Sequence, residues 1–192
     1  MKIILATTSP YRKEVFESLD ILFEVEGSNV DESQVESSDP EELVRELSKL
    51  KAEAVAKNHK DAIVIGFDSV GFFNGNILEK PKSKEESFER LKSLSGKEHY
   101  LYTGIHMINN LSGKVISKVN KNKIFMRKYS DEEIEKYFSQ DQRFNTFSLG
   151  YNTEKHISAS FIEKIEGNHL NLKGIPLSDV IEMLNEMDYK EE

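Results

Sequence analysis

The chain has 192 residues and no cysteine, and its 34 acidic and 26 basic residues give a formal net charge of −8. Without cysteine there is no disulfide or thiolate metal site, and the excess acidic charge disfavours a nucleic acid polymer as a partner. The apolar runs fall short of the roughly 20 residues that span a membrane. The length predicts a single domain over residues 1–192. Because the N-terminal apolar run is too short for a signal peptide, we expect the protein in the cytoplasm.

The first half of the chain predicts alternating strands and helices. Residues 2–6 are apolar and β-branched, which is typical of a buried strand, and Ser9 followed by Pro10 is a helix start. The run "AIVIGFDSVGFF" begins with continuous apolar residues, which favours a central strand covered on both faces. In chain order we expect a strand at 2–6, a helix at 10–19, a strand at 23–27 with Phe23 and Val25 inward, a helix at 40–58, a strand at 62–73 and a turn at 74–76.

The second half adds three strands and three helices. Ser130 followed by acidic residues predicts a capped helix, and "ISASFIEKIEG" alternates like a strand. The expected elements are a helix between Pro81 and Gly96, strands at 99–110 and 114–128, a helix from Ser130, a strand at 157–167 and a helix at 176–187. This mixture predicts an α/β or α+β fold around one twisted mixed sheet.

The stretch "TTSPYRK" at residues 7–13 is the first candidate site. A helix N-terminus has unpaired N–H groups and a partial positive charge, so it favours anions. Arg12 and Lys13 add formal charge in the first turn, where a helix built for stability carries acidic residues. An ordinary N-cap with solvated cations explains the same residues, and both interpretations stay open at this point.

Asp68 is the second candidate, because it lies at the end of the very apolar strand. A carboxylate there loses water unless it is paired, so it could bind a divalent metal or act as a general base. A strand-end aspartate that caps a turn is the simpler alternative. Three further residues are weaker candidates: Lys51 beside the apolar stripe of its helix, Lys80 on a turn, and the acidic loop residue Glu32.

Taken together and in order, these segments resemble the Maf family. The resemblance rests on "LATTSPYRKEVF", "NVDES", "LSKLKAEAVA", "GFDSV" with "NGNILEKP", "LKSLSGKEHYLYTGI" and "FIEKIEGNHLNLKGIPLSDVIEML". These segments cover nearly the whole chain. The resemblance implies an elongated twisted mixed sheet in two lobes, flanked by helices and with a central cleft, similar to inosine triphosphate pyrophosphatases.

The activity that the resemblance implies is hydrolysis of a pyrimidine or non-canonical nucleoside triphosphate to the monophosphate and pyrophosphate. It implies a divalent cation, Mg²⁺ or Mn²⁺, and allows a homodimer. Matched residue by residue, Asp68 is the catalytic carboxylate and a metal ligand together with Glu32. The positions that match triphosphate contacts in the family are Ser9, Arg12, Lys51 and Lys80.

The positions tied to base selection depart from the family pattern. Tyr11 stands where the family has an arginine, Ser69 replaces a threonine, and Lys155 falls on a glutamine position, while Gly150 matches. The positions that match phosphate and metal contacts therefore follow the family pattern, whereas the positions that match base contacts do not. This departure leaves two alternatives: a nucleotide-binding regulator of cell division with little turnover, and an activity on deaminated or methylated purines.

Overall fold

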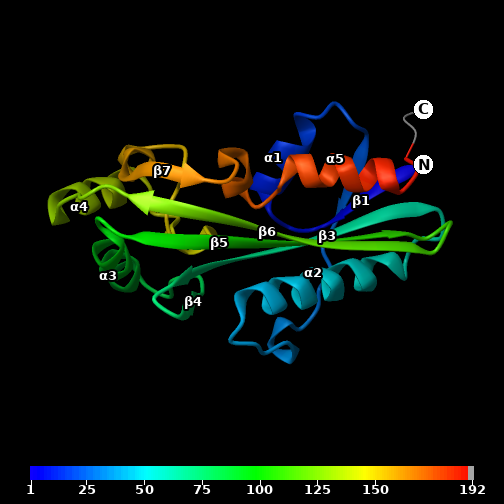
Figure 1. The fold of residues 1–192 in the computed structure, drawn as a ribbon, viewed down its shortest axis with the longest axis horizontal. Coiled ribbons are helices and arrows are strands. Elements are labelled where there is room, and N and C mark those ends of the chain that lie inside the picture. Colours follow the sequence, from blue (N-terminus) through cyan, green and yellow to red (C-terminus); the bar gives the residue numbers. More distant parts are fainter. Residues whose placement is uncertain (190–192) are drawn as a thin grey trace. The chain divides into compact units, whose positions relative to one another are not determined.

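The computed structural model describes residues 1–189 (Figure 1). Its helices and strands in chain order are β1 (Lys2–Ala6), α1 (Pro10–Glu17), β2 (Phe23–Glu26), α2 (Pro40–Ala56), β3 (Ala62–Phe73), β4 (Asn76–Leu78), α3 (Lys84–Leu94), β5 (Glu98–Asn109), β6 (Lys114–Met126), α4 (Asp131–Gln140), β7 (Ile162–Glu166) and α5 (Leu177–Glu186). Short 3-10 turns include Glu32–Gln34 and Ile157–Phe161. No helix within the described chain is long and apolar enough to cross a membrane.

One sheet of seven strands confirms the predicted mixed α/β class. The strand order is β2-β1-β3-β5-β6-β7, and β4 pairs with β3. β1 runs parallel to both β2 and β3, whereas β3–β4 and β6–β7 are antiparallel pairs, so the sheet is mixed. The predicted central position of β3 is confirmed, and its residues 62–68 are all buried.

The chain forms two compact units. The first contains residues 1–69, 103–120 and the described chain from 173 onward, and the second contains residues 70–102 and 121–172. The long strands β3, β5 and β6 each contribute residues to both units. The single domain over residues 1–192 stays a prediction.

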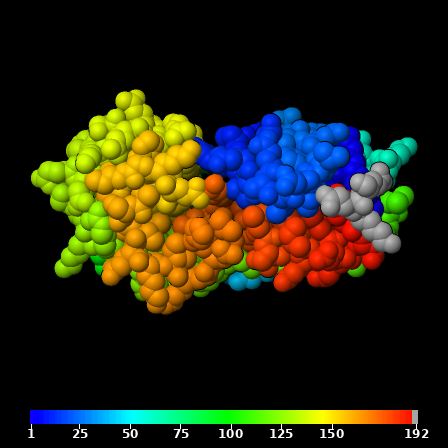
Figure 2. All heavy atoms as spheres, turned by 90° about the horizontal axis from the view of Figure 1, so that it is seen from above, coloured from blue at the N-terminus to red at the C-terminus, as the bar shows by residue number. Residues whose placement is uncertain are grey.

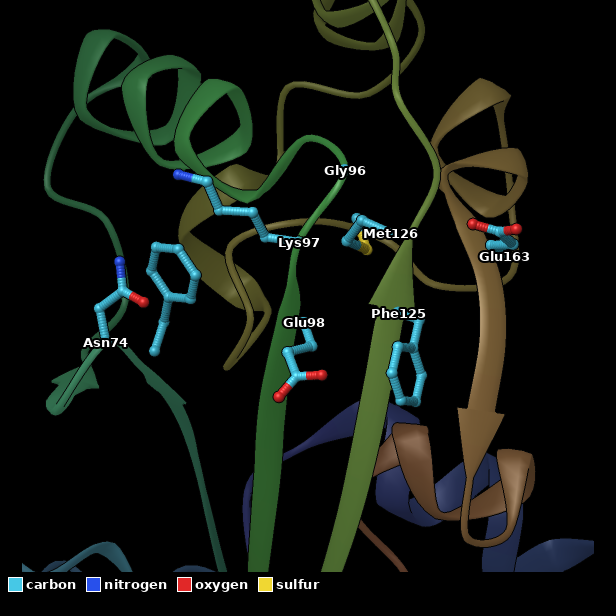
Figure 3. A pocket seen from close by; sticks show the side chains of 8 residues that line it. Asn74, Gly96, Lys97, Glu98, Phe125, Met126 and Glu163 are labelled. Carbon is cyan, nitrogen blue, oxygen red and sulfur yellow. The ribbon is translucent and has the colours of Figure 1, made fainter.

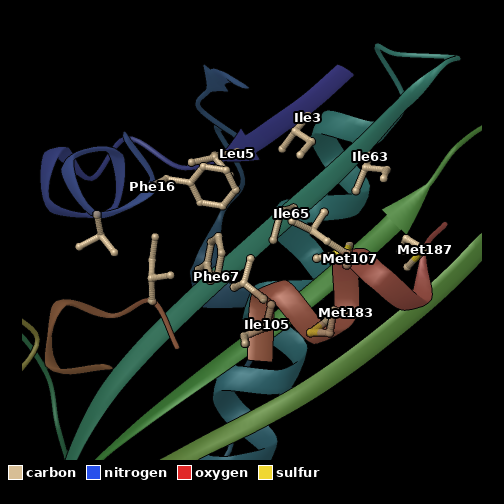
Figure 4. Packing of buried hydrophobic residues seen from close by; sticks show 14 residues of the cluster. Ile3, Leu5, Phe16, Ile63, Ile65, Phe67, Ile105, Met107, Met183 and Met187 are labelled. Atoms are coloured by element: carbon tan, nitrogen blue, oxygen red, sulfur yellow. The ribbon is translucent and has the colours of Figure 1, made fainter. Parts of the chain in front are cut away.

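The first unit is built on both faces of its part of the sheet. On one face, apolar residues of β1, β3 and β5 pack against α1 and α5, and the buried cluster includes Ile3, Phe16, Ile65, Phe67 and Met183 (Figure 4). This packing brings the N-terminal segment and α5 side by side, which Figure 2 shows as neighbouring blue and red surfaces.

Helix α2 covers the other face of the first unit, and two glycines let it approach closely. A Cβ on Gly66 of β3 would collide with the carbonyl oxygen of Ser48, and one on Gly104 of β5 with that of Val44. Backbone can approach backbone this closely only where a side chain is missing. The close packing places the fourth turn of α2, which carries Lys51, against the middle of β3.

The second unit has its own core between the sheet and helices α3 and α4. Its buried members include Leu91, Leu101, Ile124, Tyr137 and Phe161. Ser130 and Glu133 form the capping box of α4, which confirms the predicted helix start.

Three sequence predictions are wrong in detail. Asp68 does not end its strand: it lies in the middle of β3, which runs on to Phe73 because residues 71–73 pair with β4. The strand expected at 157–167 exists only as β7, because Ser158 is buried and its hydroxyl donates to the carbonyl of Asn152 at 2.7 Å, which holds residues 157–161 in a 3-10 turn. Val25 does not point inward: it is 41% exposed, since β2 is a short strand at the edge of the sheet. Phe23 does contact the core, with its ring 5.0 Å from that of Phe16.

Candidate active site

The N-terminus of α1 carries the first group of predicted residues. Ser9 is the N-cap, and its hydroxyl accepts the backbone N–H of Arg12 at 3.4 Å. The Ser9 N–H in turn donates to the buried Thr7 hydroxyl at 3.1 Å. No acidic residue lies in the first turn, so the partial positive charge of this helix end is not neutralised locally. Tyr11, on the same turn, is half-buried.

Arg12 is turned into the first unit, where its guanidinium joins three segments. Nε donates to the carbonyl of Gly174 at 3.2 Å, Nη1 to that of Phe67 at 3.1 Å, and Nη2 to the Ser69 hydroxyl at 3.1 Å. Burial lowers the pKa of Arg12, and the charges of Asp68 and Glu32 act in the opposite direction. The cation that looked misplaced in the helix therefore connects α1 to the middle of β3.

Two residues that sequence reasoning did not assign to the site complete this arrangement. Gly174 has φ +78°, and a Cβ there would lie 3.0 Å from the Ser69 hydroxyl and 3.4 Å from Nε of Arg12. Thr103 of β5 is buried, and its hydroxyl pairs with that of Ser69 at 3.0 Å. The turn "NLKGIPL" and the segment "YTGI" were the only sequence signals for these two positions.

Lys51, Asp68 and Glu32 form the charged centre of the first unit. Nζ of Lys51 lies 2.6 Å from Oδ1 of Asp68 and 3.1 Å from Oε1 of Glu32. The side chains of Lys51 and Asp68 are 12% and 10% exposed, whereas that of Glu32 is 54% exposed. The sequence left open whether Lys51 points inward, and the structure shows that it does.

The two carboxylates suit a divalent cation only in part. Both contact one ammonium group, so their oxygens converge on a point where a cation is stable. Within residues 1–189 no group of three or more His, Asp or Glu side chains gathers as a metal site. Mg²⁺ is commonly held by one or two carboxylates together with waters and substrate phosphates, so Asp68 and Glu32 fit a metal that completes its coordination with phosphate oxygens.

In the second unit the remaining predicted residues, Lys80 and Lys155, lie on backbone that side chains hydrogen-bond. Lys80 and Lys155 are both exposed. Nη1 of Arg90 donates to the carbonyl of Glu79, next to Lys80, at 2.5 Å. The Asn152 side chain accepts the N–H groups of Glu154 and Lys155 at 3.0 and 3.1 Å, which holds the turn that presents Lys155.

A buried histidine pairs with a tyrosine inside the second unit. Nε2 of His99 lies 3.1 Å from the hydroxyl of Tyr151, and His99 is fully buried. Burial lowers the pKa of His99 to about 4, so the ring is neutral near pH 7. Burial raises the pKa of Tyr151 well above its ordinary value. Both groups are therefore uncharged parts of the core.

The second unit also contains a cavity of about 400 Å³. It is lined by Phe73, Asn74, Gly96, Lys97, Glu98, Phe125, Met126 and Glu163 (Figure 3). The ammonium of Lys97 lies 5.6 Å from the centre of the Phe73 ring, which is a cation–π contact. None of the predicted site residues lines this cavity, so it lends no support to the predicted phosphate or base contacts.

Comparisons with known proteins agree with the resemblance seen in the sequence. The chain is 42% identical over 188 residues to a dTTP/UTP pyrophosphatase of Thermotoga maritima, covering 97% of this chain and 89% of the relative. It is 38% identical over 185 residues to a dTTP/UTP pyrophosphatase of Thermoanaerobacter sp. (strain X514), covering 96% and 95%. A HAM1 protein structure from Coxiella burnetii aligns with a TM-score of 0.47 at 14% identity, covering 95% of this chain and 99% of that one. The sequence model of the Maf family, described as Maf-like protein, matches residues 2–187, and the chain belongs to this family.

Proposed function

We propose that this protein is a metal-dependent nucleoside triphosphate pyrophosphatase that hydrolyses pyrimidine nucleoside triphosphates to the monophosphate and pyrophosphate. The observation that carries the proposal is the buried Asp68 in the middle of β3, paired with Lys51 and next to Glu32. The names of the related dTTP/UTP pyrophosphatases support the reaction and the pyrimidine substrate.

The reaction requires an oriented water and neutralised phosphate charge. The water oxygen forms a bond to the α-phosphorus while the bond from that phosphorus to the bridging oxygen breaks, and pyrophosphate leaves. The Asp68 carboxylate orients the water and accepts its proton. Lys51, the Ser9 hydroxyl and the N-terminus of α1 offer positive charge and donors to the phosphate oxygens.

A divalent cation, when bound by Asp68 and Glu32, adds charge neutralisation at the phosphate oxygens. The phosphate contact of Lys80 is part of the proposal. So is base selection by Tyr11, Ser69 and Lys155. The hydroxyl of Ser69 also bonds Arg12 and Thr103, so we propose that Ser69 positions Arg12 in addition to its role in base selection. A homodimer and a cytoplasmic location remain predictions.

Arg12 belongs to the proposal in a second way. Three of its N–H groups are bound to Phe67, Ser69 and Gly174, so only the remaining N–H groups of the guanidinium can reach a phosphate. We therefore propose that Arg12 fixes the position of α1 against β3 and also contributes its charge to the phosphate site.

The test is a panel of nucleotides with Mg²⁺ or Mn²⁺ and detection of pyrophosphate. We expect release of pyrophosphate and monophosphate from UTP and dTTP, and its loss in Asp68→Asn. A protein that binds these nucleotides tightly without turnover would be a regulator instead. A higher kcat/KM for a methylated or deaminated purine triphosphate would overturn the pyrimidine assignment and leave the reaction class intact.

A further inference from the structure

The ammonium of Lys51 lies where a cation between Asp68 and Glu32 would lie. It is 2.6 Å from one carboxylate and 3.1 Å from the other, which are close ion-pair distances. The side chains of Lys51 and Asp68 are only 12% and 10% exposed, so water screens the contact between these two weakly. In the free protein the carboxylate pair is therefore already neutralised in part by a side chain.

We propose that Lys51 and a divalent cation compete for this carboxylate pair. In the free protein Lys51 excludes the metal, and the metal binds only together with a triphosphate, whose oxygens then receive the ammonium. The inference rests on the proposed function, because it names how the metal of that reaction reaches the site. It follows that the protein binds the metal together with the triphosphate and does not bind the metal tightly beforehand.

Charge explains why the metal and the ammonium exclude each other in the free protein. Asp68 and Glu32 carry two negative charges, and Lys51 offsets one of them. The Arg12 guanidinium, which interacts electrostatically with both carboxylates, offsets most of the other, so a divalent ion would meet little net negative charge. Within residues 1–189 no third His, Asp or Glu side chain joins the two carboxylates as a ligand, and Mg²⁺ held by two carboxylates usually also takes substrate phosphates. A triphosphate removes both obstacles, since it brings further oxygens and enough negative charge to hold the ammonium as well.

The arrangement also allows Lys51 to move without the backbone. Helix α2 is locked against β3 and β5 at Gly66 and Gly104, so the Cα of Lys51 is fixed. The flexible four-carbon stem of a lysine lets its ammonium change partners. Asp68 is buried on a strand, whereas Glu32 lies 54% exposed on the short 3-10 turn, so Glu32 is the partner that can adjust.

The test measures Mn²⁺ binding to the nucleotide-free protein by electron paramagnetic resonance of the unbound ion. The variants are Lys51→Met and Lys51→Gln, and the matched control is Lys49→Met on the same helix, whose ammonium lies 3.9 Å from Glu46 at the surface. We expect weak Mn²⁺ binding to the wild type and to the control, and affinity about tenfold higher or more in both Lys51 variants. Adding Glu32→Gln to Lys51→Met should remove that gain.

Unchanged Mn²⁺ affinity in both folded Lys51 variants would overturn the proposal, as would a gain that survives Glu32→Gln. If neither variant folds by circular dichroism, Glu32→Gln alone decides. It should weaken Mn²⁺ binding in the presence of the α,β-imido analogue of UTP but not in its absence, and equal weakening in both conditions would contradict the competition. The titrations of the free protein involve no nucleotide and no turnover, so they still give a result if the proposed reaction fails.

Discussion

The two units hold their predicted functional residues in different ways. In the first unit the side chains themselves are engaged: Arg12 donates to three partners, and Lys51 joins Asp68 and Glu32. In the second unit Lys80 and Lys155 are exposed, and the structure holds the backbone beside them through Arg90 and Asn152.

This difference indicates that the two units prepare their functional side chains for the substrate in different ways. Buried charges must be paired, so the first unit arranges its chemistry before any substrate arrives. Exposed lysines have several rotatable bonds and become ordered only when a ligand binds. Substitutions in the first unit should therefore affect both stability and activity, whereas those at the exposed lysines should affect activity alone.

The sharpest test of the first unit is Asp68→Asn. We expect kcat/KM to fall by about a thousandfold, because the variant loses the base and a metal ligand. The control is Asp61→Asn, an exposed carboxylate just before the same strand, which should retain activity. A fully active Asp68→Asn protein would remove Asp68 from the mechanism.

Arg12→Ala tests whether the three hydrogen bonds of the Arg12 guanidinium stabilise the fold. The change leaves the carbonyls of Phe67 and Gly174 without their donor, and we expect the free energy of unfolding to fall by about 3 to 4 kcal/mol in urea titrations. Arg12→Lys should not restore it, since one ammonium cannot reach all three acceptors. The exposed neighbour Lys13→Ala should change stability by less than about 0.5 kcal/mol. Equal stabilities for Arg12→Ala and Lys13→Ala would contradict the structural role.

The second unit has its own pH-dependent element in His99. Its pKa is about 4 in the folded protein, against 6.5 for an ordinary histidine. Between these values the unfolded chain binds more protons, so stability should fall as pH drops from 6.5 to 4, by about 3 kcal/mol from this residue. His99→Gln should lose this dependence in urea titrations at several pH values, and exposed His169→Gln should keep it. A flat profile in the wild type would show that His99 is not neutral and buried.

Gly150→Ala probes how closely the backbone of the second unit is held. Gly150 has φ +81°, and a Cβ there would lie 3.2 Å from Pro81 and 3.3 Å from Nη1 of Arg90. We expect a loss of about 2 kcal/mol. Gly75 has the same φ and nothing within 4 Å of its added Cβ, so Gly75→Ala should lose only about 1 kcal/mol. If the two losses are equal, crowding at Gly150 is not significant.

The sequence alone determined the order of helices and strands and the family. Neighbouring residues were sufficient to predict an element where they alone determine it. Ser9 and Pro10 start α1, Ser130 caps α4, and a continuous apolar run indicates the central strand β3. They were misleading at residues 157–161, where a hydroxyl bond to Asn152 turns an alternating segment into a 3-10 turn.

Only the tertiary structure decided what the charged residues do. Arg12 reaches carbonyl oxygens 55 and 162 residues away, and no spacing in the sequence encodes those backbone acceptors. Lys51 stood beside the apolar stripe of its helix, and only the close packing of α2 at Gly66 brings its ammonium to Asp68. The physical reason is that hydrogen bonds and ion pairs depend on distances of a few ångströms, which are set by packing between segments far apart in the chain.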